Sequence, residues 1–368
     1  MEVIYLITHA KQTGPVNQAL NILTGLNRVE GVHASLLTLE PEIEANTWLQ
    51  RFRENNIDIV QFNLHKWDVI GCVVKLRDLI KKRHIDVIHS SGYKADFINM
   101  MVRRNVTTVS TQRSLPTEVV EKLPKLIRPV LEKIHLSIIK KMDHVVACSK
   151  ALQRVFVEQY GMNVLAVQNA VNTDFFTPAS LEKKGELRKE LCLPIDNSVY
   201  LVLGSLRERK NVGLIIQAFK EINDNRIQLM IVGDGPDRDE LSKIANTDSR
   251  IKFIGSTSRP KDYLQASDFL VSSALAEGLP NTVLEALSCG LIPILSDIEP
   301  HKELVENTSV EHIFEKRSKE ELKTNLVNSL SWNKEIQSKE ARRVALSTFD
   351  IDSLAKNYIS IYTSSNKH

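Results

Sequence analysis

Two glutamates, Glu277 and Glu285, bracket the start of an expected helix in the segment VSSALAEGLPNTVLEALSCGLIPILSD, residues 271–297. Apolar runs separated by a glycine- and proline-containing loop predict a β-loop-α-β unit, with its parts at 269–272, 277–280, 281–289 and 292–295. The unpaired N–H groups and positive dipole end of a helix start favour an anion such as a diphosphate, and carboxylates accept hydrogen bonds from sugar hydroxyls. Anion and polyol together indicate a nucleotide sugar as the ligand.

A second candidate group is the cationic loop GSLRERKN, residues 204–211, which follows an apolar run. Arg207, Arg209 and Lys210 lie within four residues there, between an expected strand end and a helix start. Lysine supplies a point charge and arginine a planar fork, so the loop can hold phosphates, although a solvated charged loop is the commoner explanation of such a run. Because this loop and the Glu277 loop both follow strands of one expected parallel sheet, they can converge at the same edge.

Two glycine-containing loops are weaker candidates. Gly14 lies in the loop after the first apolar run, 3–7, and glycine there permits close approach of the backbone to a ligand. Gly235 lies in the turn GDGP, residues 233–236. A plain strand-to-helix connection explains Gly14 equally well, and a tight turn is the simpler interpretation of Gly235.

Length and periodicity predict an α/β protein with two domains. The chain of 368 residues is too long for one ordinary core. Short apolar runs alternate with helical patterns throughout, which is typical of doubly wound parallel sheets covered by helices. We predict three segments, namely an N-terminal domain, a C-terminal domain and a final helix that packs back on the N-terminal domain, at 1–170, 171–348 and 349–368.

Composition excludes several classes of function. A hydrophobic fraction of 42% and a charged fraction of 25% are those of a soluble globular protein, and a net charge of +3 gives no reason to expect nucleic acid as a partner. The four cysteines have no metal-like spacing, which predicts buried thiols in a reducing compartment. No secretory signal and no apolar run of about 18 residues is visible, so we expect a cytoplasmic protein.

The segment at 121–142 carries an excess of four positive charges beside an apolar face. Such a segment can lie on anionic lipid headgroups, and an ordinary surface helix with a solvated basic face explains it equally well. The first explanation predicts peripheral contact with the inner face of the cytoplasmic membrane.

The order of these motifs resembles the retaining glycosyltransferases of family 4, also called glycosyl transferases group 1. The E-x7-E signature of that family is matched by Glu277 and Glu285. Four further family elements appear in the same order, as VACSK at 146–150, NAVNTDFFTP at 169–178, GSLRERKN at 204–211 and VGDGP at 232–236. The resemblance covers almost the whole chain.

The resemblance implies the GT-B architecture, in which two Rossmann-like doubly wound domains face a central cleft, with acceptor bound by the N-terminal and donor by the C-terminal domain. It implies that Lys210 holds the donor diphosphate, Glu285 the ribose hydroxyls and Glu277 the transferred sugar. Ser205 stands where many relatives have arginine, so Arg207 or Arg209 would supply the fork. The implied catalytic set is Glu277, Lys210 and Arg207. The implied donor-binding set is Gly14, Ser205, Arg209, Lys210, Gly235, Glu277, Gly278, Leu279, Pro280, Asn281 and Glu285.

For the acceptor, the resemblance points to His9, His89, Lys94 and Arg113, with HSSGYKAD at 89–96 matching a family element in part. A structural role is as good an explanation for each histidine. No cofactor is expected, and no DxD motif at this site suggests a metal. The implied function is transfer of a hexose or N-acetylhexosamine from a nucleotide sugar to a saccharide or polyprenyl-linked oligosaccharide, in the synthesis of O-antigen, capsule or lipopolysaccharide.

Three alternatives use other chemistry. A nucleotide-sugar 2-epimerase or hydrolase of the same fold would share the donor residues and would consume donor rapidly without acceptor. A two-lobed binding protein would close on a solute, but nothing in it calls for the charged set above. A dinucleotide-dependent oxidoreductase is disfavoured because no GxGxxG follows an early strand.

Overall fold

The computed structural model describes residues 1–42, 47–104, 106–119 and 127–364. Contacts divide it into two units, one formed by Met1–Ala170 with Ile351–His368 and the other by Val171–Asp350. The sequence places the same boundary after residue 170 and begins the last segment at 349. The N-terminal part of the predicted basic segment at 121–142 lies outside the described residues.

The first unit is built on a seven-stranded sheet in which all paired strands are parallel. Its order is β3-β2-β1-β4-β5-β6-β7, with strands β1 Glu2–Ile7, β2 His33–Thr38, β3 Ile59–Gln61, β4 Val87–Ser90, β5 Thr107–Gln112, β6 His144–Ala147 and β7 Leu165–Ala166. The interior strand β1 is buried over five of its six residues. A strand covered on both faces explains its unbroken apolar sequence.

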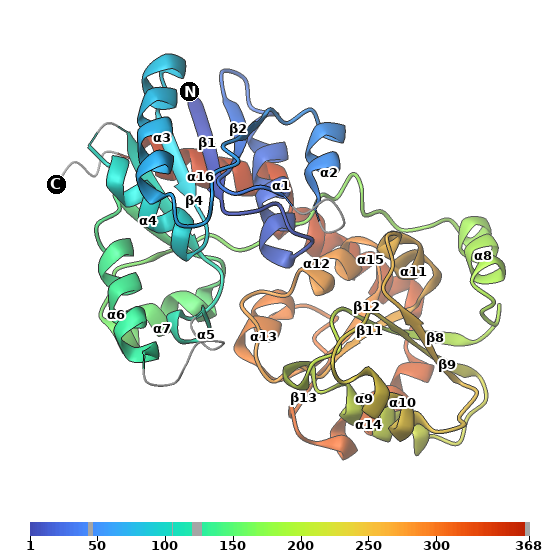
Figure 1. The fold of residues 1–368 in the computed structure, drawn as a ribbon. Coiled ribbons are helices and arrows are strands. Elements are labelled where there is room, and N and C mark those ends of the chain that lie inside the picture. Colours follow the sequence, from blue (N-terminus) through green and yellow to red (C-terminus); the bar gives the residue numbers. More distant parts are fainter. Residues whose placement is uncertain (43–46, 105, 120–126, 365–368) are drawn as a thin grey trace. The chain divides into compact units, whose positions relative to one another are not determined.

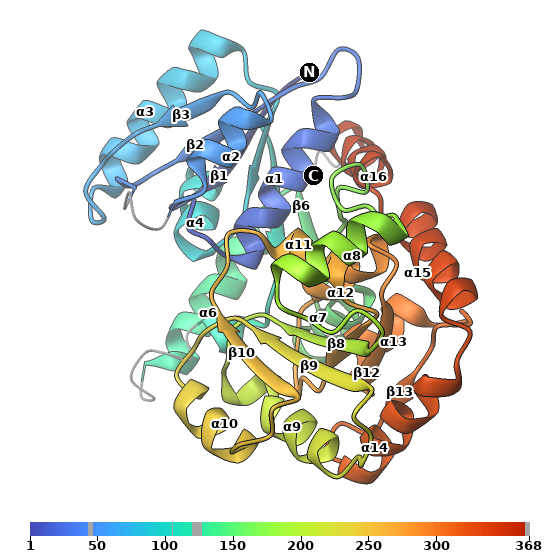
Figure 2. The same ribbon diagram turned by 90° about the vertical axis from the view of Figure 1, so that its right-hand side faces the viewer.

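Helices cover both faces of this sheet, as Figures 1 and 2 show. They are α1 Gly14–Leu26, α2 Leu49–Glu54, α3 Val69–Arg83, α4 Tyr93–Val102, α5 Pro116–Val119, α6 Arg128–Ile139, α7 Lys150–Tyr160 and α16 Ile351–Thr363. Helices α3, α4 and α6 form a continuous layer, because α4 packs against both of the others. Helix α16 packs against α1, and Gly25 permits this approach, since a Cβ there would lie 2.4 Å from the carbonyl oxygen of Ile351.

The second unit has a six-stranded parallel sheet of order β10-β9-β8-β11-β12-β13. Its strands are β8 Ser198–Leu203, β9 Ile227–Val232, β10 Ile251–Gly255, β11 Phe269–Ser272, β12 Ile292–Ser296 and β13 Ile313–Phe314. Its α-helices are α8 Leu181–Glu190, α9 Val212–Lys220, α10 Arg238–Ala245, α11 Pro260–Ala266, α12 Asn281–Ser288, α13 Glu299–Val305, α14 Lys319–Asn328 and α15 Lys334–Thr348. Figure 2 shows α9, α10 and α14 on one face and α8, α11 and α12 on the other.

Strand order reverses once in each sheet, between β1 and β4 and between β8 and β11. Loops leaving two such neighbouring strands turn to opposite faces and open a crevice at the carboxyl edge, where α/β sheets bind ligands. The prediction of two doubly wound parallel sheets is confirmed. In the basic segment at 121–142, the described residues are helical from Arg128 to Ile139, as α6.

The segment by which the chain first passes from one unit to the other, after Ala170, is anchored at both of its ends. In the first unit, the side chains of Gln18 and Asn21 donate to the carbonyl oxygen of Ala170 at 2.8 and 2.7 Å. In the second unit, the guanidinium of Arg342 donates to the carbonyl oxygens of Thr173 and Phe176 at 2.9 and 2.7 Å. The free length of the linker is therefore short.

Candidate functional site

The central feature of the second unit is an ion cluster at the strand-order reversal. Lys210 ends a short 3₁₀ turn after β8, and Glu277 lies in the loop after β11. The Nζ atom of Lys210 donates to Oε1 of Glu277. The guanidinium of Arg209 lies 3.1 Å from Oε2 of the same carboxylate. The structure thus brings together the two loops that the sequence places on one sheet edge.

Backbone contacts hold the two loops in register. The N–H of Leu275 donates to the carbonyl oxygen of Arg209 at 2.8 Å, and the guanidinium of Arg209 donates to that of Ala276 at 3.1 Å. The hydroxyl of Ser273 reaches the carbonyl oxygens of Lys210 and Asn211 at 3.1 and 2.8 Å. The charged side chains are therefore set on a rigid base.

The electrostatics of Glu277 follow from burial and charge together. Its side chain is 8% exposed, whereas those of Lys210 and Arg209 are 20% and 53% exposed. Burial alone would raise the pKa of Glu277, but the positive charges of Lys210 and Arg209 outweigh that effect, and its pKa is lowered. The glutamate is an anion at neutral pH.

A buried histidine beneath this cluster is absent from the sequence-based prediction. His301 of α13 is fully buried, with Nδ1 lying 3.1 Å from Oγ and 3.0 Å from the carbonyl oxygen of Ser296, and Nε2 lying 3.4 Å from Oγ of Ser272. Burial lowers its pKa to about 4, so the ring is neutral at pH 7. The only signal in the sequence is its place just after a strand end, which is too common a feature to single it out.

The glycines of the turn at 233–236 have a packing role. A Cβ on Gly233 would lie 1.8 Å from the carbonyl oxygen of Gly204, and one on Gly235 would lie 2.1 Å from that of Leu206. Both glycines let the loop after β9 press its backbone against the cationic loop after β8. Gly235 therefore shapes the candidate donor site by supporting its loop.

Helix α12 presents one polar face. Asn281, Thr282 and Glu285 are partly exposed, whereas Leu279 and Pro280, which lead into the helix, are buried, as are the apolar residues of the helix. Gly278 is partly exposed. At 100° per residue, Glu285 lies about 40° around the helix from Asn281. Glu285, which the resemblance assigns to the ribose hydroxyls, is therefore on the same face of α12 as the residue that begins the helix.

Two predicted donor residues are more peripheral. Ser205 and Arg207 are both exposed in the cationic loop. Of the two arginines offered by the sequence, Arg209 is the one that contacts the carboxylate of Glu277. A cavity of about 20 Å³, lined in part by Gly204, Ser205, Lys210 and Thr282, lies under the loop, which is room for about one water molecule.

In the first unit, a cavity of about 210 Å³ lies at the corresponding strand-order reversal, between β1 and β4. It is lined by Ile7, Thr8, His9, Lys11, Thr13, Pro15, Val16 and Ser91. His9 Nε2 lies 3.1 Å from Oε2 of Glu40, and Nζ of Lys94 lies 2.7 Å from Oε1. The sequence indicated His9 and Lys94 but missed Glu40, which joins them. Gly14, which the resemblance places in the donor-binding set, is the first residue of α1 and lies between Thr13 and Pro15, which line this cavity.

His89 and Arg113 lie elsewhere in this unit. His89 is fully buried, with Nδ1 lying 2.7 Å from the hydroxyl of Tyr362 and Nε2 lying 2.7 Å from that of Thr111. The hydroxyl of Tyr362 belongs to α16 and that of Thr111 to β5, so both nitrogens are used inside the core of the unit. This corrects the prediction that His89 contacts an acceptor. The guanidinium of Arg113 donates to Oδ1 of Asn169 at 2.7 Å and to the hydroxyl of Tyr5 at 3.2 Å.

Comparison with known families matches both units. Residues 183–343 match the family model Glycosyl transferases group 1, and residues 13–175 match Glycosyltransferase Family 4. The chain belongs to glycosyltransferase family 4. The first match contains the whole Lys210, Arg209 and Glu277 cluster, whereas α16 lies outside both.

Individual relatives of this family 4 member are distant. It is 26% identical over 250 residues to UDP-Gal:alpha-D-GlcNAc-diphosphoundecaprenol alpha-1,3-galactosyltransferase of Escherichia coli, a match that covers 64% of each chain, just under two thirds of that relative's length. It is 22% identical to the O-antigen biosynthesis glycosyltransferase WclY of Escherichia coli, with 83% of this chain and 82% of that one covered.

Solved structures establish the fold of this family 4 chain as GT-B. A glycosyltransferase from Rickettsia africae superposes with a TM-score of 0.81 at 16% identity, covering 98% of this chain and 97% of the other. Anabaena HepE in complex with UDP and glucose superposes with a TM-score of 0.81 at 17% identity, covering 99% and 100%. At this level of identity the similarity defines the fold alone.

Proposed function

We propose that the protein transfers a hexose or N-acetylhexosamine from a nucleotide sugar to a saccharide or polyprenyl-linked acceptor. The observation that carries the proposal is the cluster of Lys210, Arg209 and Glu277 at the strand-order reversal of the second unit. Two cations hold one buried carboxylate at the sheet edge where ligands bind, beside the N-terminus of α12.

The chemistry of the donor site follows from these charges. A departing nucleoside diphosphate gains negative charge in the transition state, and preorganised positive groups stabilise it. Lys210, Arg209 and the first N–H groups of α12 are such groups, and Glu277 then remains an anion that can accept hydrogen bonds from the sugar and stabilise an oxocarbenium-like centre. Because the protein itself supplies this positive charge, we expect turnover without a divalent metal.

We propose that the acceptor is bound by the first unit, at the cavity beside His9. Nε2 of His9 faces Glu40, and Nδ1 is buried with no hydrogen-bond partner among the described residues. Glu40 also binds Lys94, whose Nζ donates to the carbonyl oxygen of Lys66 at 2.8 Å. His9 lines the cavity, and a substrate hydroxyl there would contact its imidazole, with Glu40 as the positioning residue.

The names of relatives support the choice of substrates. The galactosyltransferase of Escherichia coli is named for UDP-Gal and a diphosphoundecaprenol-linked acceptor, and WclY is named for O-antigen biosynthesis. We therefore favour UDP-sugars as donors, a polyprenyl diphosphate-linked saccharide as acceptor, and a reaction at the inner face of the cytoplasmic membrane. From the resemblance to retaining glycosyltransferases, we expect the sugar to keep its anomeric configuration. Among the helices of the described ranges, none has both the length and the apolar character to span a bilayer.

A thermal-shift panel of UDP-, GDP- and ADP-sugars tests the donor proposal, because a ligand that binds only the folded protein raises its melting temperature. We expect the nucleotide sugars of one base to raise the melting temperature, and we expect Lys210→Ala to abolish that rise. Lys243→Ala, an exposed lysine of α10 in the same unit, is the matched control and should retain it. If no nucleotide sugar shifts the melting temperature, the donor site is refuted.

Product analysis tests the reaction itself. With acceptor present, we expect NMR to show a glycoside of retained anomeric configuration. The same product should form whether or not EDTA is added. With acceptor omitted, we expect the donor to be consumed slowly. Rapid donor loss without acceptor would indicate the epimerase or hydrolase instead. His9→Ala and Glu40→Gln should raise the KM for acceptor or lower kcat while leaving the donor thermal shift unchanged.

A further inference from the structure

The outer face of one helical layer in the first unit carries an unusual share of exposed apolar side chains. Of the nine large apolar side chains exposed in the described part of this unit, seven belong to α3, α4, α6 or the residue just before α6 or shortly before α3. They are Trp67, Ile70, Val74, Met101, Ile127, Val130 and Ile134. Soluble proteins expose such residues singly, and a gathering of them on one face marks an interaction surface.

Two helices of this layer each present a stripe. On α3, Ile70 and Val74 are 80% and 59% exposed and share an arc of about 60° with Arg77 and Lys81 at 100° per residue. The buried residues of α3 lie on the other side of the helix. Helix α3 is therefore apolar along the first half of its outer face and cationic along the second.

Helix α6 repeats the apolar part of this pattern. Ile127, Val130 and Ile134 are 42%, 58% and 43% exposed and fall within an arc of about 60°. The buried residues His135, Ile138 and Ile139 face α4 and the sheet side of the layer. This stripe lies in the described part of the basic segment that the sequence singled out.

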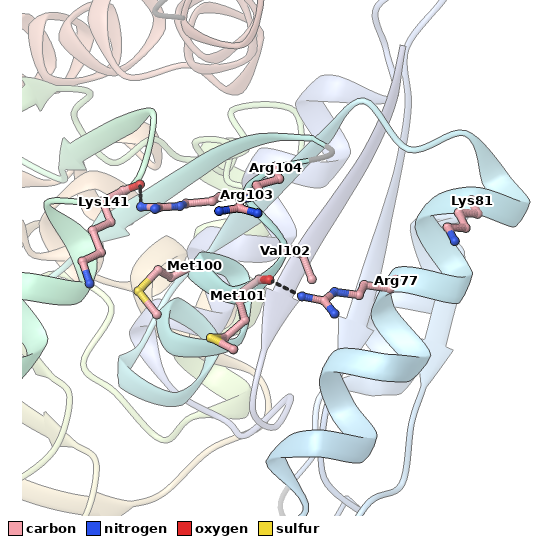
Figure 3. A pocket seen from close by; sticks show the side chains of 8 residues that line it. All are labelled: Arg77, Lys81, Met100, Met101, Val102, Arg103, Arg104 and Lys141. Carbon is pink, nitrogen blue, oxygen red and sulfur yellow. Dashed lines mark hydrogen bonds between the residues drawn. The ribbon is translucent and has the colours of Figure 1, made fainter. Parts of the chain in front are cut away.

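A cationic cavity opens where the three helices end. Its volume is about 520 Å³, and its lining contains five cations and no acidic residue (Figure 3), the residues being Arg77, Lys81, Met100, Met101, Val102, Arg103, Arg104 and Lys141. Figure 3 shows Met100 and Met101 lying between the basic side chains. The cavity combines positive charge with an apolar floor.

Part of this charge is available to a ligand. The guanidinium of Arg77 donates to the carbonyl oxygen of Met101 at 3.0 Å, and that of Arg103 to the carbonyl oxygen of Lys141 at 3.5 Å. Within the described ranges, no carboxylate forms an ion pair with any of the five cations. Backbone carbonyl groups, one in α4 and one in the turn after α6, orient two of the arginines and leave their positive charge uncompensated.

We propose that this face of the α3, α4 and α6 layer docks on an anionic lipid bilayer, with the two apolar stripes in the interfacial region and lipid phosphates in the cationic cavity. Exposed aliphatic and tryptophan side chains next to lysine and arginine suit the headgroup region, where both kinds of contact contribute. A second copy of the chain fits poorly as the occupant, because an isologous contact through this face would bring two cationic cavities into one interface, and their linings contain no acidic residue to pair with them.

The reason why the protein would bind a membrane rests on the proposed function, since a polyprenyl-linked acceptor is held in a membrane. The position of the binding surface rests on the described side chains alone. Helices α3, α4 and α6 end at the edge of the sheet where the strands begin, because a crossover helix returns the chain to that edge. The cavity is therefore at the opposite edge of the first unit from His9, and changes in it leave the candidate acceptor residues untouched.

Co-sedimentation with lipid vesicles tests the proposal on the full chain. We expect binding to vesicles of phosphatidylglycerol and phosphatidylcholine in equal parts, weak binding to phosphatidylcholine alone, and a fall in binding as sodium chloride is raised. The pair Lys81→Glu and Arg104→Glu should lower the partition coefficient at least about tenfold, given the contribution of each basic residue near an anionic surface. The pair Ile70→Ser and Val74→Ser should lower it by a similar factor.

Matched controls separate a local effect from a general one. Arg53→Glu reverses an exposed charge on α2 of the same unit, and Ile336→Ser removes a side chain that is 61% exposed on α15. Both should retain wild-type binding. Three outcomes would overturn the proposal. The first is equal binding to both lipid compositions, and the second is a loss of binding in Arg53→Glu as large as in the cavity variants. The third is a dimer of the wild-type chain that dissociates when Ile70 and Val74 are changed. A retained thermal shift with nucleotide sugar in all variants would show that the proposed function stands regardless.

Discussion

The ion cluster of Lys210, Arg209 and Glu277 allows its structural and functional roles to be separated by a double-mutant cycle. The variants are Lys210→Met, Glu277→Gln and the two together. Removing one partner of a fully buried pair costs about 3–5 kcal/mol because a charge is left uncompensated. Here Lys210 is 20% exposed, and Arg209 remains 3.1 Å from Glu277, so we expect a loss of about 1–2 kcal/mol in the free energy of unfolding for each single change.

The cycle should show coupling, and activity should not follow stability. We expect an interaction energy of about 1 kcal/mol between Lys210 and Glu277 from urea unfolding at pH 7, with the double variant nearer to wild type than the sum of the singles. Glycosyl transfer should fall about 10²–10³-fold in Lys210→Met, as for loss of one preorganised donor at a developing oxyanion, and should stay lost in the double variant. Lys243→Met is the control for both measurements.

The pH dependence of the coupling provides an independent check. The pKa of Glu277 is lowered in the folded state, so its contribution to stability is complete above the ordinary glutamate range and is lost as the pH falls through and below that range. The coupling should thus be constant from pH 6 to 8 and disappear in acid. Activity of Lys210→Met within tenfold of wild type, or a coupling that grows on acidification, would refute the assignment.

Three further predictions concern buried contacts within the two units. Gly235→Ala should lower the free energy of unfolding by about 1–3 kcal/mol and weaken nucleotide-sugar binding, because its Cβ would lie 2.1 Å from the carbonyl oxygen of Leu206. Denaturant unfolding would measure the first effect and thermal shift the second. If neither changed, the loops after β8 and β9 would be able to separate. The pKa of His301 is lowered to about 4, so the neutral imidazole stabilises the fold fully above the ordinary histidine pKa of about 6.5, and this contribution is lost as the pH falls from about 6.5 to 4. The free energy of unfolding of the wild type, relative to that of His301→Gln, should therefore decline across this interval. A difference that does not change with pH would contradict the argument from burial. Tyr362→Phe should cost about 1–3 kcal/mol by leaving Nδ1 of His89 without its partner, measured by urea unfolding, and an unchanged midpoint would mean that this hydrogen bond is dispensable.

Sequence reasoning is most successful where local patterns decide the outcome. Apolar runs of four or five residues predicted the interior strands β1, β11 and β12, because a strand covered on both faces has to be apolar along its length. It is weakest where two prolines interrupt the segment at 121–142, since helix ends depend on contacts as much as on propensity. The short strand β13 carries too few residues to give a period.

The candidate residues divide in the same way. Lys210 and Glu277 stand out because each follows an apolar run, and parallel strands direct both loops to one edge. His89 has an equally suggestive position in the sequence, yet it is fully buried against Tyr362, a residue 273 positions away. Glu40 carries no local signal and gains its interest only from the contacts of its two oxygens.

The sequence by itself therefore determined the family, the alternation of strands and helices, and the loops that hold the charged residues. The tertiary structure decided that Arg209 contacts Glu277, that His301 lies neutral beneath the cluster, and that the exposed apolar side chains of α3 and α6 belong to one layer. The physical reason is that strand order and helix packing bring together side chains far apart in the chain, and no periodicity along the sequence records which of them meet.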